Sequence, residues 1–253
     1  WDVSNVSNME GMFYFIGNNT CQDIESDLTN WDVSNVTNMS YMFRHIGYGT
    51  QKIRGIGNWD VSNVTDMNSM FAGSQWNGGN VPGRPTDFNW DISGWNVSNV
   101  TDMVAMFSYC YFGEQPYNNY APNPIVEPGI ENWDVSSVNT MNSMFYGSNF
   151  NEQIGDWDVS NVTSMDGMFG TLPNPSSFGS FESIISGEFE QFNQDISSWD
   201  VSNVTGMDGM FSRSIFFNQD ISGWDVSNVT TMNGMFYAIN GYGGNPNKDF
   251  SNW

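Results

Sequence analysis

Hydrophobic and polar positions follow one pattern that recurs along the whole chain. It reads W-D-V-S-N-V-T-x-M-x-x-M-F, and we number its positions from Trp, position 1, to Phe, position 13. Apolar and polar residues alternate over Trp-Asp-Val, which predicts a strand with Trp and Val facing inward and Asp facing outward. The two Met residues and Phe are spaced i, i+3, i+4, which predicts one short helical or 3₁₀ turn.

The pattern occurs eight times, and its shortest spacings, 24 and 25 residues, give the length of a basic coil. Self-similarity at such a period is typical of stacked repeat architectures. We therefore predict a single domain over residues 1–253, in which the coils share one apolar interior. The coils start near residues 1, 31, 59, 95, 133, 157, 199 and 224.

The Met residues indicate what fills this interior. All 16 of them occupy positions 9 and 12, and Phe follows at position 13 in every repeat. A residue type confined to two positions occupies one repeated environment, and core packing is favoured over a ligand site because Met commonly fills gaps in cores. The predicted structural core comprises Trp1, Trp31, Trp59, Trp95, Trp133, Trp157, Trp199, Trp224, Met9, Met12 and Phe13.

The residues before Trp complete the coil. In the segment F-N-Q-D-I-S-S-W-D-V, residues 192–201, the spacing of Ile196, Trp199 and Val201 matches the strand of a leucine-rich repeat. The fold class predicted is mainly β: a leucine-rich-repeat-like parallel solenoid with short strands, short helical or 3₁₀ turns and long insertions on one side. The insertions follow position 13 and occupy residues 14–30, 44–58, 72–94, 108–132, 170–198 and 237–252.

Composition agrees with turns and short strands and limits the partners. Aromatic residues make up 16% of the chain and Gly numbers 26, while Lys and Arg together number six. The formal net charge of −22 excludes nucleic acid, which needs a basic surface, and argues against anionic lipid. No apolar run reaches 18 residues, so we predict no membrane span.

Position 2 carries a row of carboxylates, for which the sequence allows either a structural role or a metal-binding role. Each Asp can accept hydrogen bonds from the turn that follows it, as in an Asx turn. Alternatively, adjacent coils bind calcium, because rows of carboxylates suit that ion, although no known calcium loop motif is present. Asn96 replaces Asp in one repeat, and the row comprises Asp2, Asp32, Asp60, Asp134, Asp158, Asp200 and Asp225.

Position 5 carries a row of Asn, expected to point inward and hydrogen-bond backbone groups at the turn. Each of these residues also opens an N-V-S or N-V-T sequon, but glycans at strand spacing would crowd one another. Asn18 and Asn38 are the better candidates for glycosylation. Ser and Thr at positions 4 and 7, such as Ser4 and Thr37, are expected to satisfy backbone donors. The Asn row comprises Asn5, Asn35, Asn63, Asn99, Asn161, Asn203 and Asn228.

The insertions are the surfaces that do not repeat. Residues 108–132 contain Tyr109, Tyr111, Phe112, Tyr117 and Tyr120 among several prolines. These rings either contact a sugar or protein partner or fold back over the coils as a cap. Residues 246–253 resemble the segment before Trp and would continue into Asp2, so we expect a piece of a longer array or a subunit that associates end to end.

No catalytic arrangement stands out. The single His, His45, is expected to be solvated, and no Ser-His or Cys-His pair or phosphate loop is evident. Most acidic residues belong to repeated positions, whereas acid–base catalysis needs one distinct pair. We predict that the chain is not an enzyme and has no cofactor except, on the second interpretation above, calcium. Whether Cys21 and Cys110 are bonded stays open.

The repeat W-D-V-S-N-V-T-x-M-x-x-M-F, with F-N-Q-D-I-S between units, resembles that of the BspA-type leucine-rich-repeat surface proteins. The resemblance covers essentially the whole chain, and the long unequal insertions depart from it. It implies a solenoid displayed outside the cell, at the surface or in the extracellular space, with a role in a fibre, coat or adhesin. The alternative is a module that binds glycans or proteins through its insertions.

Overall fold

The computed structural model describes residues 1–14, 25–46, 52–73, 86–112, 128–171 and 192–237. These residues contain four three-residue strands, β1 (Glu25–Asp27), β2 (Lys52–Arg54), β3 (Thr86–Phe88) and β4 (Cys110–Phe112). Two short 3₁₀ helices, η1 (Ile56–Asn58) and η2 (Ile130–Asn132), precede Trp59 and Trp133. The described chain is therefore almost without helix, as the composition predicts. In these ranges no helix combines the length and apolar character that a membrane crossing requires.

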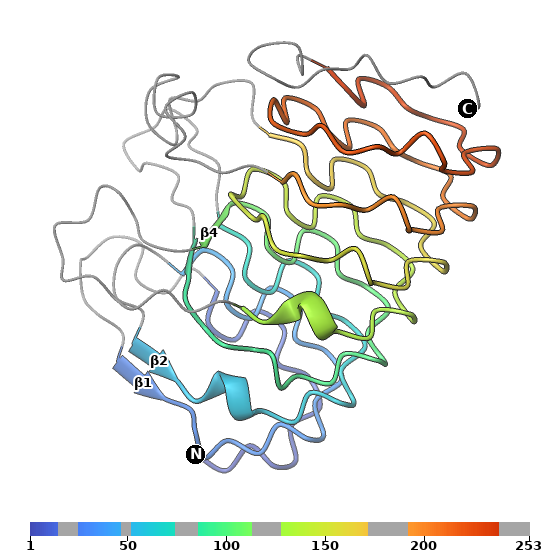
Figure 1. Ribbon diagram of the computed structural model, residues 1–253. Helices are drawn as coiled ribbons and strands as arrows, with labels where there is room; N and C mark the ends of the chain where they lie inside the picture. The colour runs from blue at the N-terminus through green and yellow to red at the C-terminus, as the bar shows by residue number, and fades with distance from the viewer. Residues whose placement is uncertain (15–24, 47–51, 74–85, 113–127, 172–191, 238–253) are drawn as a thin grey trace, which may run out of the picture.

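The strands form two parallel pairs, β1 with β2 and β3 with β4 (Figure 1). In the first pair Glu25 lies opposite Lys52 and Asp27 lies opposite Arg54. Cross-strand partners of opposite charge stabilise a sheet modestly. Two of the six basic residues are thus set against carboxylates of the neighbouring repeat.

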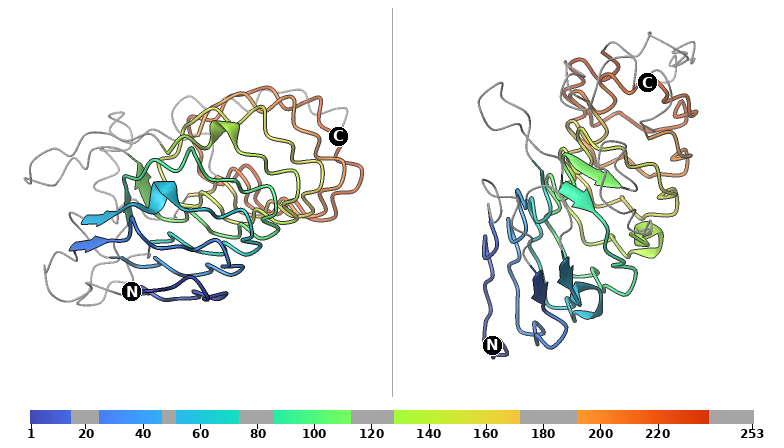
Figure 2. Two further views of the ribbon diagram at one scale, coloured as in Figure 1. Left: turned by 90° about the horizontal axis from the view of Figure 1, so that it is seen from below. Right: turned by 90° about the vertical axis from the view of Figure 1, so that its left-hand side faces the viewer.

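The repeats stack in sequence order. Position 8 of each repeat forms a parallel bridge with position 8 of the next, in an unbroken series from Asn8 to Thr231. Backbone N–H groups beyond this bridge donate to the following repeat; Met39 donates to Asp66 O at 2.9 Å and Phe43 to Met70 O at 2.8 Å. Figures 1 and 2 show the resulting layers, each lying against the one before it.

The predicted strand over positions 1–3 is wrong, although Trp and Val are buried there and Asp is exposed. Backbone groups in this segment are used in local turns: Trp59 N–H donates to Ile56 O at 3.1 Å, and Val64 N–H to Val61 O at 2.9 Å. Groups paired within a turn are not free to pair with a neighbouring layer. Within positions 1–13, the backbone hydrogen bonds between layers therefore begin only at position 7.

The predicted helical or 3₁₀ turn at the two Met residues is also wrong. Positions 9–12, which we call the Met turn, are closed by a bond such as Met42 N–H to Met39 O at 3.2 Å. Position 11 has a positive φ in all eight repeats, as in the third residue of a type II turn. Gly adopts this conformation without strain and occupies position 11 four times, at Gly11, Gly167, Gly209 and Gly234.

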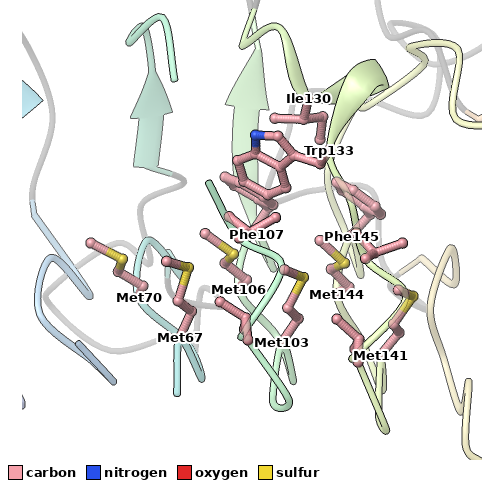
Figure 3. Close-up of a cluster of buried hydrophobic side chains, with 14 of the residues drawn as sticks. Met67, Met70, Met103, Met106, Phe107, Ile130, Trp133, Met141, Met144 and Phe145 are labelled. Atoms are coloured by element: carbon pink, nitrogen blue, oxygen red, sulfur yellow. The ribbon is translucent and has the colours of Figure 1, made fainter. Parts of the chain in front are cut away.

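Columns of identical side chains form the interior. Val at positions 3 and 6 and Met at positions 9 and 12 are buried throughout the middle repeats. Phe rings at position 13 stack from repeat to repeat at 5.3–5.9 Å between centroids. Figure 3 shows the two Met columns beside Phe107 and Phe145, with Trp133 above them.

The first repeat departs from the predicted core. In this repeat Trp1 is 94% exposed and Met12 and Phe13 are partly buried, although Met9 is buried. Trp31 of the second repeat is also partly buried, whereas Trp59 and the later Trp residues of position 1 are buried. The reason is geometric, because the first repeat is covered by a neighbour on one side only.

The buried Trp residues also hold the layers together through polar bonds. Each indole N–H donates, at 2.9–3.3 Å, to a carbonyl of the preceding repeat, three residues before that repeat's own Trp. A buried indole needs such a partner. The residues concerned are Trp59, Trp95, Trp133, Trp157, Trp199 and Trp224.

Candidate functional site

The Asp row of position 2 is hydrogen-bonded within its own repeat. In all seven repeats the Asp Oδ1 accepts the N–H of the Ser two residues later, at 3.0–3.1 Å. Asp134 also accepts the Ser136 hydroxyl at 2.6 Å. Asn96 accepts the same two bonds from Ser98, at 3.2 and 2.8 Å. An amide can therefore replace the carboxylate in this turn.

These bonds favour the charged carboxylate. The Ser hydroxyl, followed by the Ser N–H, lowers the pKa of Asp2, Asp32, Asp60, Asp134, Asp200 and Asp225. Among the described residues, no group of three or more His, Cys, Asp or Glu side chains lies close enough to hold a metal ion. The calcium interpretation of the row stays a prediction.

We expect Asp134→Asn to lose stability relative to wild type at neutral pH and to match it in acid. The folded-state pKa of Asp134 is lowered, so its contribution is present above the unfolded pKa of about 3.9 and is lost as pH falls through the folded value. Burial raises the pKa of Asp66, so the contribution of Asp66 to stability changes with pH in the opposite direction. The contribution of Asp134 is therefore taken from the difference in melting temperature between variant and wild type at each pH. Melting temperatures measured across this pH range test the expectation. Asp134→Ala is the control, because it removes both Ser136 bonds at every pH.

The Asn row of position 5 lies on the surface and not in the interior as predicted. The side chains nevertheless bond backbone, because from Asn35 onward each Nδ2 donates to the Ser carbonyl of the preceding repeat at 2.7–2.8 Å. The interior has no room for them, since Val occupies both inward positions flanking the turn. The row therefore links layers from outside.

Of the two glycosylation candidates, Asn18 lies outside the described residues. Asn38 sits at the bridge position, where its Oδ1 accepts the Ser40 N–H at 2.8 Å and the Ser40 hydroxyl at 2.7 Å. Its amide is partly buried between layers. Glycosylation at either residue stays a prediction.

The Thr residues of position 7 also link layers, but as donors. Each Thr Oγ1 donates to the position 7 carbonyl of the preceding repeat at 2.9–3.2 Å. The prediction that these hydroxyls satisfy backbone donors is therefore wrong for this position. Ser4 behaves differently, because its hydroxyl donates to Asp2 at 2.6 Å.

A surface that varies between repeats surrounds the Met turns. It consists of positions 10, 11, 14 and 15, and we call it the turn surface. Tyr14 and Tyr237 are 44% and 60% exposed there, and guanidinium groups lie 5.3 Å from ring centroids in the pairs Arg44–Tyr41 and Arg213–Tyr237. The motif does not reveal this surface, because its positions 10 and 11 accept different residues and positions 14 and 15 are assigned to the insertions. Among the described residues, its aromatic and basic members are Tyr14, Tyr41, Arg44, His45, Tyr109, Tyr146, Arg213 and Tyr237.

His45 is not solvated as predicted. It is half-buried, and its Nε2 accepts the Nε–H of Arg44 at 3.1 Å. Burial, with the charge of Arg44, lowers the pKa of His45 to about 4. The ring is therefore neutral at physiological pH and orients the arginine beside it.

The insertion aromatics that the structure describes fold back onto the core. Tyr111 is buried, and Phe112 packs against Phe88 and Phe150 at 5.3 and 5.4 Å. Tyr109 lies edge-on to Tyr146 at 5.6 Å. Tyr117 and Tyr120 lie outside the described residues, as do the terminal residues 246–253 and part of each insertion.

Of the two cysteines, Cys110 lies in the part of the chain that the structure describes. Cys110 is buried, and its thiol lies 3.2 Å from the carbonyl oxygen of Phe71. Cys21 lies outside the described residues. Whether the two cysteines are bonded stays open.

Comparison with known proteins identifies one family. Its sequence model, described as Mycoplasma protein of unknown function, DUF285, matches residues 15–127, 119–179 and 173–253. No curated protein and no solved structure matches the chain. The match is to this family, and the resemblance to the BspA-type proteins stays a resemblance.

Proposed function

Because the chain belongs to the family described as Mycoplasma protein of unknown function, DUF285, we propose that it is a structural repeat protein displayed at the cell surface or in the extracellular space. Its repeat character follows from the overlapping family matches and from a pattern that occurs eight times. The observation that supports a structural role best is the unbroken series of bridges from Asn8 to Thr231. The repeated hydrogen bonds of the chain hold adjacent layers together.

The architecture proposed is a leucine-rich-repeat-like solenoid. Three kinds of side chain support it, because Trp, Asn and Thr each donate to the preceding repeat at a fixed position. Backbone bonds run between the same pairs of layers. A repeat held by its neighbours in this way forms part of an extended, quasi-one-dimensional body.

Association with further layers, end to end, is part of the proposal. Trp1 stacks on Trp31 at 6.4 Å, the spacing also found for Trp95–Trp133 and Trp199–Trp224, and its outer face is exposed. A layer added there would bury Trp1 as the later Trp residues are buried. That layer belongs to a longer polypeptide or to a second copy, as in a fibre, coat or adhesin.

The proposal includes a non-catalytic role. In the described chain the repeated polar side chains are engaged in structural hydrogen bonds, the Asp row within its turns and the Asn and Thr rows between layers. We expect calcium to be dispensable for the same reason, since the turn accepts Asn96 in place of Asp. The alternative function is a glycan- or protein-binding module that acts through the insertions.

Electron microscopy of the purified chain, with and without a calcium chelator, tests the assembly. We expect rods or filaments that lengthen with concentration and persist in chelator, and we expect Trp1→Glu to shorten them because it places a charge in the apolar contact. Single short particles at every concentration would contradict end-to-end association. Turnover of soluble glycans, abolished by one acidic substitution, would contradict the non-catalytic role.

A further inference from the structure

A groove on the turn surface joins the first two repeats. It is a shallow, open hollow of about 620 Å³ lined by Asn8, Glu10, Gly11, Tyr14, Tyr41 and Arg44. All six residues belong to the Met turns of the first two repeats or to their flanks. The lining combines two phenol rings with a carboxylate, an amide and a guanidinium.

Tyr41 has a left-handed backbone conformation, which residues other than Gly rarely adopt. It occupies position 11 with a φ of 58°, where four other repeats have Gly and the remaining three have Ser or Ala. The left-handed conformation is unfavourable for a residue with a Cβ and favourable for Gly. The turn imposes this conformation in every repeat and forms with Gly, Ser or Ala, so it does not require the ring of Tyr41.

Arg44 and Tyr14 are fixed around this ring. The Arg44 guanidinium carbon lies 5.3 Å from the centroid of Tyr41, and its Nε–H donates to His45 Nε2 at 3.1 Å. Tyr14 packs at an angle of 61° against the His45 ring, at 5.7 Å between centroids. The rings and the cation are therefore arranged before any ligand binds, which reduces the entropic cost of binding.

Two further residues of the lining supply hydrogen-bonding groups. Glu10 and Asn8 are exposed, and Asn8 Oδ1 accepts the backbone N–H of Glu10 at 2.8 Å, which orients the Asn8 side chain. A carboxylate accepts hydrogen bonds, a guanidinium donates them, and an amide does both. Tyr adds a rigid, amphipathic contact area.

We propose that this groove binds a neutral polysaccharide chain. Pyranose rings offer an apolar C–H face for Tyr14 and Tyr41, and hydroxyl groups for Glu10, Asn8 and Arg44. The net charge of −22 repels acidic polymers and selects against them. The groove is open at the surface, so it accepts internal units of a long chain. Binding here requires no assembly into filaments.

Affinity electrophoresis of the full chain through gels that contain soluble β-1,3-glucan, xyloglucan, mannan or alginate tests the proposal. We expect at least one neutral polysaccharide to retard the wild type and alginate to leave its mobility unchanged. Tyr41→Gly should weaken the retardation about tenfold, which corresponds to about 1.4 kcal/mol. Its melting temperature should not fall, because Gly relieves the strain at position 11.

Tyr237→Ala is the matched control. Tyr237 occupies the position of Tyr14 in the last repeat and carries Arg213 over its ring, but it lies outside the groove. We expect this variant to bind as the wild type does. Retardation by alginate alone, no retardation by any neutral polysaccharide, or equal losses in Tyr41→Gly and Tyr237→Ala would each overturn the proposal.

Discussion

Trp133→Ala should lower the free energy of unfolding by about 3–5 kcal/mol. Trp133 is 5% exposed and stacks on Trp95 at 6.4 Å with 3° between the ring planes. Removal leaves a cavity above Phe107, whose centroid lies 6.3 Å away (Figure 3). It also removes the indole N–H that donates to Ile92 O at 3.3 Å. Equilibrium urea unfolding followed by circular dichroism measures the loss.

Trp1→Ala provides the control at the same repeat position. Trp1 is exposed, so its removal opens no cavity, and the stability should stay within about 0.5 kcal/mol of wild type. The measurement needs dilute protein, because association at Trp1 would add stability of its own. Equal losses in Trp133→Ala and Trp1→Ala would contradict a shared interior formed by stacking.

The repeat and its buried columns could be predicted from the sequence because a fixed spacing of large apolar residues has few structural explanations. Trp59, Met67 and Phe71 occur at the same three positions in every repeat, and all are buried. Alternation cannot reveal which segment pairs with its neighbour. Apolar and polar residues alternate over Trp-Asp-Val as in a strand, yet the backbone groups of this segment form hydrogen bonds within local turns.

The helical turn predicted at the two Met residues is wrong because the spacing of Met and Phe fits both a helical turn and the observed Met turn. Met, Met and Phe at i, i+3 and i+4 lie on one side of a helix, but they also follow from a turn whose third residue is left-handed. A signal was available in Gly11, Gly167, Gly209 and Gly234, since Gly recurs where φ is positive. Ser, Ala and Tyr at the same position in the other repeats obscured it.

The candidate groove could not be found by searching for what repeats. Positions 10, 11, 14 and 15 vary, and the meaning of Tyr41 depends on its left-handed backbone, which only the structure reveals. Arg44 and His45 lie in a stretch that the sequence assigns to an insertion, and their contact with each other is a tertiary feature. The repeated positions predict the stacked core, and the positions that vary between repeats are where the candidate groove lies.

The close approach of layers explains a second sensitive position, outside the core. Gly155 lies two residues before Trp157, and a Cβ added there would collide with the carbonyl oxygen of Asp195 in the next layer. The carbonyl belongs to the backbone, so it moves only if the layers separate. Gly155 itself accepts a bond from the Ser198 hydroxyl at 2.8 Å, which would be disturbed as well.

Gly155→Ala should therefore destabilise the chain by about 1–3 kcal/mol, as overpacking does in a close-packed interior. Gly223→Ala is the control, because a Cβ there meets nothing within 4 Å and neither residue has a positive φ. With no clash, Ala restricts the unfolded chain, so Gly223→Ala should be neutral or stabilise by up to about 1 kcal/mol. Urea unfolding of both variants measures the difference. A Gly155→Ala variant as stable as Gly223→Ala would mean that adjacent layers do not approach as closely as the hydrogen bonds between them require.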